Sequence, residues 1–154
     1  MPVIIQKATL QNLQDIQNLN NKLFDLELSN SDPDLIPGWP LSLAGEAYFK
    51  DMIESHFVLI ARDNDETVGY FAGTIGIKEV YSTGELAEID NMFILESHRG
   101  RGIGKMFFDA FRTECAAHGT TDIRVTASAK NIDAVRSYEK WGFTPKNVTL
   151  NYKI

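Results

Sequence analysis

The sequence lacks several features that would point to whole classes of protein. Its 154 residues include one cysteine, Cys115, so no internal disulfide can form, which predicts a reducing compartment. No apolar stretch approaches the roughly 20 residues that a membrane-spanning helix needs. The first residues have neither a basic leader nor a long apolar core, so we expect no secretion signal. These absences predict a cytoplasmic protein that does not act on a membrane.

The composition and charge narrow the class further. Hydrophobic residues make up 44% and charged residues 23% of the chain, as in a folded globular protein, and the length predicts one domain over residues 1–154. The net charge of -6 argues against a general nucleic-acid binder. The charge is uneven: 5 - 16 = -11 before Arg99 and 10 - 5 = +5 from Arg99 onward. This polarity suits an anion site in the C-terminal third and a cationic partner elsewhere, with a plain solvated acidic surface as the alternative.

Hydrophobic periodicity and turn residues predict an α+β fold, in which a mixed sheet is flanked by helices in the order β-α-α-β-β-β-α-β-α-β. We expect strands at residues 3–7, 57–62, 67–78, 85–95, 123–127 and 148–154, and helices from 9 to about 28, 43 to about 54, 102–118 and 131–141. The strand–helix–strand unit near Arg99 places a glycine-rich turn between a strand end and a helix start, where ligands often bind.

The glycine-rich turn from Arg99 to Lys105 is the most specific feature of the sequence. Backbone N–H groups at a helix start are unpaired, and glycines let an anion approach them closely. With the positive charges of Arg99, Arg101 and Lys105, the turn predicts a pyrophosphate site. A nucleotide phosphate loop would need glycine at position 99 and Ser or Thr at 106, and a dinucleotide fingerprint would need Gly or Ala at 105, so both are excluded.

The run from Arg99 to Gly104 also resembles the coenzyme A signature of the GNAT superfamily of N-acetyltransferases, which is Arg or Gln, two residues, Gly, one residue, then Gly or Ala. The pattern Asn131, Ala134, Tyr138, Gly142, Phe143 is similar to the last helix of that family. The resemblance implies acetyl-CoA as co-substrate and no metal. It implies coenzyme contacts at Met92, Phe93 and Ile94 on a strand edge, at Arg99, Gly100, Arg101, Gly102, Ile103, Gly104 and Lys105 in the turn, and at Asn131 and Tyr138.

The strand before the turn holds two candidate catalytic carboxylates. Two-residue alternation puts Glu88, Asp90 and Met92 on one face. The resemblance implies that this strand carries a bulge and splays from the next one, so that pantetheine lies against its free edge and a backbone N–H polarises the thioester carbonyl. Aminolysis needs a neutral amine, and a nearby carboxylate could take the amine proton.

The resemblance therefore implies Asp90 as base or substrate anchor with Glu88 in support; whether Asp90, Glu88 or water is the base stays open. It implies Tyr138 as the general acid that protonates the departing thiolate. A functionless pair of exposed carboxylates is the alternative for the strand. Three aromatic residues in or near the Pro-rich loop, Trp39, Tyr48 and Phe49, either line the acceptor pocket or only pack the core.

The sequence and the resemblance together predict an N-acetyltransferase in which a primary amine attacks acetyl-CoA directly in a ternary complex. The acceptor is expected to be a cationic small amine or a peptide N-terminus, and dimers are common in the family. The alternative is a catalytically silent coenzyme A-binding sensor or interaction module. The three histidines show no metal-site spacing, and Cys115 is expected to pack in the core.

Overall fold

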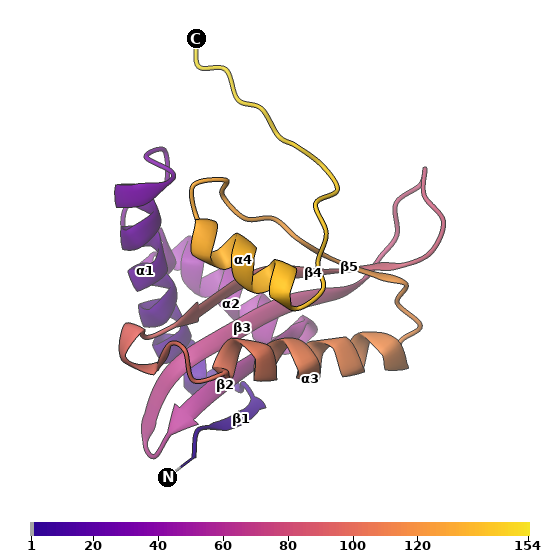
Figure 1. Cartoon of the computed structure of the whole chain (residues 1–154). Coiled ribbons are helices and arrows are strands. Elements are labelled where there is room, and N and C mark those ends of the chain that lie inside the picture. The colour runs from indigo at the N-terminus through magenta and orange to yellow at the C-terminus, as the bar shows by residue number, and fades with distance from the viewer. Residues whose placement is uncertain (1) are drawn as a thin grey trace.

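The computed structural model describes residues 2–154 and confirms the α+β fold, with a five-stranded mixed sheet between helices (Figure 1). The α-helices and strands, with their bounds, are β1 (Ile4–Lys7), α1 (Leu13–Asn30), α2 (Leu43–Ser55), β2 (Phe57–Asp63), β3 (Glu66–Ile77), β4 (Leu86–Ile94), α3 (Ile103–Ala117), β5 (Asp122–Val125) and α4 (Ile132–Lys140). Short 3-10 turns precede α1, α2 and α3, at η1 (Leu10–Asn12), η2 (Trp39–Leu41) and η3 (Glu96–His98).

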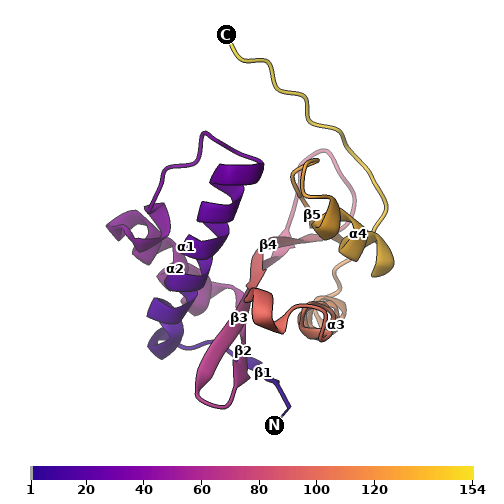
Figure 2. The same ribbon diagram turned by 60° about the vertical axis from the view of Figure 1, so that its left-hand side comes forward.

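The sheet has the order β1-β2-β3-β4-β5, antiparallel throughout except for the parallel pair of β4 and β5. Helices α1 and α2 cover one face and α3 and α4 the other (Figure 2). Alternate residues of the central strands belong to two hydrophobic cores, one on each face of the sheet. Val58 and Ile60 pack toward α1 and α2, whereas Leu59 and Ala61 pack toward α3. This buries β2 on both faces and explains its continuous apolar run.

Local signals set the start of α2 and the ends of α3 and α4 where the sequence placed them. Ser42 caps α2, because its Oγ accepts a hydrogen bond from the Gly45 N–H at 3.2 Å. Gly119 and Gly142 follow α3 and α4 in left-handed conformations, with φ of 75° and 103°. These caps depend on a few consecutive residues, which is why the sequence predicts them.

The prediction of a strand at residues 148–154 is wrong. Those residues form no regular secondary structure, and both views show the C-terminal segment running away from the body (Figures 1 and 2). The chain leaves the core after Phe143, whose ring packs 5.2 Å from that of Phe108. A strand forms only against another strand edge, and alternation of side chains alone does not supply one.

Candidate functional site

A bulge in β4 organises the site. Gly73 on β3 pairs with Ile89 and Ala72 pairs with Asn91, so Asp90 is left without a partner. Asp90 and Asn91 therefore both face α1 and α2, where they line one cavity. Met92 instead packs with the core on the α3 side. The prediction that Met92 shares a face with Glu88 and Asp90 is wrong, because the extra residue reverses the alternation.

Beyond the bulge, β4 parts from β5. Their parallel pairing ends at Ile89 with Val125, so among residues 2–154 no strand pairs with the edge of β4 from Asp90 onward. The Leu95 N–H donates to the Val68 carbonyl on β3 at 2.9 Å. Successive residues point their N–H groups to opposite edges, so the Met92 and Ile94 N–H groups face the open edge. The prediction that the Phe93 backbone also lies on this edge is wrong, since it faces β3.

The glycine turn presents an uninterrupted row of backbone donors beside this open edge. Gly100 and Gly102 adopt left-handed φ values of 72° and 79°, which other residues rarely adopt. The first hydrogen bond of α3 runs from the Met106 N–H to the Gly102 carbonyl, and among residues 2–154 no backbone carbonyl accepts from the N–H groups of residues 100–105. Apart from the adjoining residues, no described atom lies within 4 Å of a Cβ built at Gly100 or Gly102, so an anion can reach these donors.

The three cations of the turn are already engaged within the chain. Arg99 Nε donates to the Ile94 carbonyl at 2.9 Å, and its guanidinium lies 5.3 Å from the Phe93 ring centre. Arg101 Nη1 lies 3.6 Å from Asp63 Oδ2, and Lys105 pairs with Asp109 one helical turn away. Arg99 and Arg101 therefore tie the turn to neighbouring segments, and each of the three side chains keeps further N–H donors beside the backbone N–H groups of the turn.

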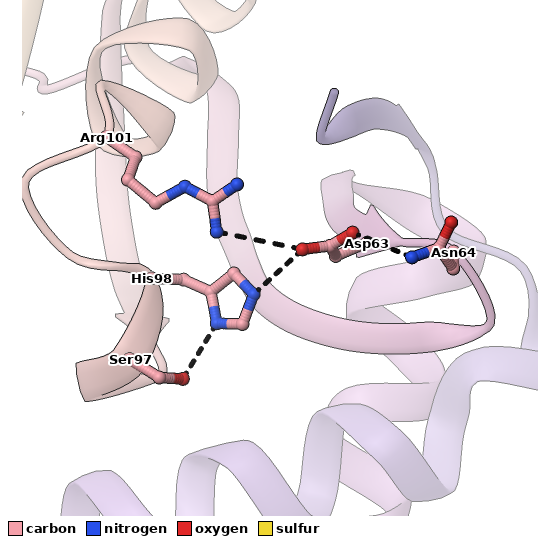
Figure 3. A network of polar contacts seen from close by, with 5 residues as sticks. All are labelled: Asp63, Asn64, Ser97, His98 and Arg101. Atoms are coloured by element: carbon pink, nitrogen blue, oxygen red, sulfur yellow. Dashed lines mark hydrogen bonds and ion pairs between the residues drawn. The ribbon is translucent and has the colours of Figure 1, made fainter. Parts of the chain in front are cut away.

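A polar network ties the glycine turn to the β2–β3 hairpin (Figure 3). His98 Nε2 lies 3.1 Å from Asp63 Oδ2, and His98 Nδ1 lies 2.8 Å from Ser97 Oγ. Asp63 thus contacts both His98, which immediately precedes the turn, and Arg101, which lies within it. Asp63 could not be singled out from the sequence, because Asp63 and His98 are 35 residues apart and no local pattern links them.

A cavity of about 240 Å³ opens on the other face of β4, between α1, η2 and α2. Its lining residues are Asn20, Leu23, Phe24, Glu27, Trp39, Tyr48, Phe49, Asp90 and Asn91. Trp39 stacks on Phe24 with ring centres 5.8 Å apart and meets Tyr48 edge-on at 5.7 Å. The three aromatic residues named from the sequence, Trp39, Tyr48 and Phe49, therefore all line one cavity.

The polar groups of this cavity are mostly hydrogen-bond acceptors. The Asn91 Nδ2 donates to Tyr48 Oη at 3.2 Å, and the Asn20 Nδ2 donates to Tyr70 Oη at 2.7 Å. Within the described part of the chain, the Oδ1 atoms of Asn20 and Asn91 have no hydrogen-bond partner, although Asn20 is only 3% exposed. A buried acceptor without a donor is costly, so these oxygens suit a ligand with N–H groups.

Glu27 adds a second carboxylate to the cavity. Burial raises its pKa, and the nearby negative charge of Asp32 raises it further. Glu27 and Asn20 were not singled out from the sequence. Their signal was available: both are polar residues that continue the apolar stripe of α1 through Ile16 and Leu23 at helical spacing.

Asp90 is held by one hydrogen bond. Thr74 Oγ1 on β3 donates to Asp90 Oδ2 at 2.7 Å. Partial burial raises the pKa of Asp90, and the negative charge of Glu88 acts in the same direction. The Thr74 hydrogen bond and the nearby His56 oppose this rise. A carboxylate with a raised pKa is a better proton acceptor than an ordinary aspartate.

Glu88, the second predicted catalytic carboxylate, forms an ion pair with an arginine. Arg124 on β5 donates to Glu88 Oε2 at 3.0 Å and, through its other terminal nitrogen, to Glu79 Oε1 at 2.9 Å. This pairing joins β4, β5 and the loop before β4. Because Arg124 already occupies its Oε2, the Glu88 carboxylate is less available than a free one to contact a bound amine. The geometry favours Asp90 over Glu88 as the proton acceptor.

Helix α4 supplies Tyr138 and Asn131. The Tyr138 ring packs against Trp141 and Phe143, and burial raises the pKa of its hydroxyl to about 12. The Asn131 Oδ1 caps α4 by accepting from the Ala134 N–H at 3.2 Å, which leaves its Nδ2 as a donor. Tyr138 belongs to the α3 side of the sheet and Asp90 to the α1 side, so the parted strand β4 runs between them.

Gly45 at the start of α2 packs closely against the backbone of Trp39, whose ring forms part of the aromatic wall of the cavity. A Cβ at this position would lie 2.4 Å from the Trp39 carbonyl oxygen and 2.5 Å from that of Pro40. We expect Gly45→Ala to lower the free energy of unfolding by about 1–3 kcal/mol, because backbone must move to accept the methyl group. Urea unfolding of this variant, with the exposed Glu46→Ala as control, measures the effect; an unchanged midpoint would contradict it.

The fold and the site together define an α+β protein. A glycine turn with unpaired backbone N–H groups and a cavity rich in hydrogen-bond acceptors lie on the two sides of strand β4. The model of the acetyltransferase (GNAT) family matches residues 14–143, and the chain belongs to that family. Mycothiol acetyltransferase of Corynebacterium glutamicum is 30% identical over 125 residues, which cover 81% of this chain and 39% of that protein. The chain thus spans about two fifths of the length of the curated relatives it matches.

Two solved structures illustrate the fold similarity. A mutant of the protein BH1408 from Bacillus halodurans superposes with a TM-score of 0.80 at 19% identity, over 98% of this chain and 99% of that one. The AAC(6')-Iy structure, in complex with a bisubstrate analogue of CoA and acetylneamine, superposes with a TM-score of 0.77 at 16% identity, over 100% of this chain and 99% of that one. Among residues 2–154, no helix has the length and apolarity to cross a membrane, and no group of metal-binding side chains is present.

Proposed function

We propose that this protein transfers the acetyl group of acetyl-CoA to the primary amine of a small cationic molecule, by direct attack in a ternary complex. The observation that supports this most strongly is the bulge at Asp90. It places a carboxylate beside the cavity at the point where β4 parts from β5. The family to which the chain belongs supports the reaction type.

The glycine turn and the open edge of β4 fit the coenzyme. The unpaired N–H groups of residues 100–105 suit its pyrophosphate, and the Met92 and Ile94 N–H groups suit its amide-bearing arm. The Asn131 Nδ2 is a further donor to it from the start of α4. When bound, acetyl-CoA supplies an acetyl group activated as a thioester. A backbone N–H of the open edge stabilises negative charge on the acetyl oxygen during transfer.

A substitution at Asp63 tests whether its contacts with His98 and Arg101 help the glycine turn to bind the coenzyme. We expect Asp63→Asn to weaken acetyl-CoA binding by about two- to fivefold, because it removes a partly exposed charge that pairs with His98 and Arg101 and contributes up to about 1 kcal/mol. Calorimetric titration with acetyl-CoA measures the change. Asp65→Asn in the same hairpin is the control, and equal affinity in the two variants would remove Asp63 from coenzyme binding.

The amine binds in the cavity on the other side of β4. Alkylamines are mostly protonated near neutral pH and must lose a proton before attack. Asp90 takes this proton at Oδ1 or Oδ2, directly or through a water molecule, while Thr74 holds the carboxylate in place. Glu88 supports the site through its pair with Arg124 and the negative charge that raises the pKa of Asp90.

Tyr138 acts on the leaving sulfur from the other face. Its hydroxyl, with a pKa of about 12, keeps its proton over the working pH range and donates a hydrogen bond to the thiolate as it departs. Because an alkyl thiol has a pKa of about 8.5, this donation stabilises the thiolate more than it protonates it. Cys115 offers no covalent alternative, since it is buried and burial raises the pKa of its thiol to about 11.

The cavity favours a small cationic amine over a peptide N-terminus. Its about 240 Å³ hold a small molecule, and its walls combine the aromatic rings of Phe24, Trp39 and Tyr48 with Glu27 and Asp90. Aromatic faces and carboxylates both attract ammonium groups. The unpartnered Oδ1 atoms of Asn20 and Asn91 can accept from the N–H groups of the same molecule.

A substitution at Glu27 tests whether the cavity prefers a cationic amine. We expect Glu27→Gln to raise the KM for a cationic amine about tenfold, because a hydrogen bond to a charged partner contributes about 1.5 kcal/mol. The KM for acetyl-CoA should stay within about twofold of wild type, since the coenzyme lies on the other side of β4. Initial-rate kinetics compare it with Asp25→Asn, which removes an exposed charge from the same helix. An unchanged amine KM would place the cation elsewhere.

The proposal is tested by coenzyme A release from acetyl-CoA over a panel of amines near pH 8. The panel contains diamines and polyamines, aminoglycosides, amino acids and peptide N-termini, with an enzyme-only blank. We expect release that saturates with one class of small cationic amine. Saturable acetyl-CoA binding without release for any amine would favour the alternative function, a coenzyme A-binding sensor that does not catalyse transfer.

A further inference from the structure

His98 lies directly before the glycine turn and has a polar partner at each ring nitrogen (Figure 3). Its Nε2 lies 3.1 Å from Asp63 Oδ2, and its Nδ1 lies 2.8 Å from Ser97 Oγ. The side chain of His98 is 13% exposed and that of Asp63 is 21% exposed, so water reaches this contact only in part. The partners of the two nitrogens therefore decide which protonation states the ring can adopt.

In the neutral state these contacts fix one tautomer of His98. A carboxylate accepts hydrogen bonds and donates none, so the ring proton must lie on Nε2, where it faces Asp63. Nδ1 is then an acceptor, and the Ser97 hydroxyl donates to it. Both ring nitrogens are paired in this arrangement.

The same contacts also accommodate a protonated His98. A hydroxyl can accept a hydrogen bond as well as donate one, so Ser97 Oγ can accept from Nδ1–H. Ser97 is exposed, so its own proton can then turn toward water. Asp63 keeps its hydrogen bond and gains an opposite charge beside it. Protonation of His98 therefore breaks no hydrogen bond in this network.

That proton changes the net charge beside the glycine turn. Arg101 Nη1 lies 3.6 Å from Asp63 Oδ2, the same atom that contacts His98. With a neutral His98, the charges of Asp63 and Arg101 cancel. With a protonated His98, the three side chains together carry one positive charge, next to the backbone N–H groups of residues 100–105. An added positive charge there attracts an anion to those donors.

We propose that protonation of His98 strengthens the binding of the coenzyme pyrophosphate at the glycine turn, so that coenzyme affinity rises as the pH falls. Histidine is the side chain that changes its charge between about pH 5 and 8. The converse follows from linkage: a bound pyrophosphate favours the protonated ring, so binding takes up a proton. The inference rests on the proposed binding of the coenzyme at the turn and names the residue that makes this binding depend on pH.

Calorimetric titration with dephospho-coenzyme A tests the coupling. This probe keeps the pyrophosphate but lacks the phosphate monoester of coenzyme A, a group that itself titrates near about pH 6. We expect the wild type to bind the probe about two- to fivefold more tightly at pH of about 5.5 than of about 8, the usual effect of a partly exposed charge pair. His98→Gln, whose amide can still donate to Asp63, should bind equally at both. Raising the salt concentration should reduce the wild-type difference, because salt screens charges.

His118→Gln is the matched control, because it removes an exposed histidine at the other end of α3. Its affinity should change with pH as in the wild type. A wild-type affinity that stays constant with pH would overturn the inference, as would the same change in His98→Gln.

Proton uptake gives a second measurement that needs no variant. Titrations of the wild type in two buffers of different ionisation enthalpy, near about pH 6.5, report the protons taken up when the probe binds. We expect a fraction of one proton, and less in His98→Gln. Binding without uptake would overturn the inference and leave the coenzyme site in place, whereas no binding of the probe or of acetyl-CoA at any pH would contradict the proposed coenzyme site itself.

Discussion

Asp90→Asn is expected to lower kcat/KM for the amine by about 10²- to 10³-fold, the usual loss when a general base is removed. The amide keeps the shape of the carboxylate and can still accept the Thr74 hydrogen bond, so the bulge should remain intact. Acetyl-CoA affinity should stay within about twofold, since the coenzyme groups lie on the open edge and in the turn. Steady-state kinetics together with calorimetric titration separate the two effects.

Two comparisons make the Asp90 result specific. Glu88→Gln should reduce the rate less, because Arg124 already occupies that carboxylate. In the wild type, kcat/KM should fall as the pH is lowered and Asp90 is protonated. Burial and Glu88 raise the pKa of Asp90, so the fall should begin at a higher pH than for an ordinary aspartate. Equal rates for Asp90→Asn and wild type would remove Asp90 from the mechanism.

Tyr138→Phe is expected to lower kcat by about 10- to 100-fold, because it removes the hydrogen-bond donor to the departing thiolate. The Phe ring keeps the contacts with Trp141 and Phe143, so the melting temperature and acetyl-CoA affinity should change little. Since burial raises the pKa of Tyr138 to about 12, the wild-type rate should show no loss from tyrosine ionisation up to about pH 10.

One result would contradict the proposed role of Tyr138. A Tyr138→Phe variant with wild-type kcat would make Tyr138 a packing residue only. Tyr138→Leu is the comparison for packing: it removes ring contacts as well as the hydroxyl, so it should lower the melting temperature where Tyr138→Phe does not. A rate that falls only in the leucine variant would assign the effect to the ring.

Much of the fold follows from short stretches of sequence. Ser42, Gly119 and Gly142 set helix ends through contacts a few residues long, and the sequence places them correctly. The glycine turn is of the same kind: its left-handed residues and helix start are consecutive, so an unpaired row of N–H groups is predictable. The parting of β4 from β5 was implied by the family resemblance and is confirmed by the strand pairing.

Features that depend on distant residues were not predictable in this way. The family resemblance implied a bulge in this strand, but its position at Asp90 depends on how β3 and β4 align, and it moves Met92 to the face opposite Asp90. The brace at Asp63 and the arginine on Glu88 join residues more than 30 positions apart in the chain. The pattern at residues 148–154 is that of a strand, yet a strand forms only where the chain runs along a sheet edge, and this segment pairs with none of the described strands.

The most direct test of the proposed direct attack follows a labelled acetyl group from acetyl-CoA. The protein is incubated with acetyl-labelled acetyl-CoA, freed of unbound coenzyme, and then given the amine that the panel identifies. Direct attack predicts that no label stays on the protein and that labelled amine forms only when acetyl-CoA and amine are present together. A stable acetylated protein that later passes its label to the amine would contradict direct attack in a ternary complex.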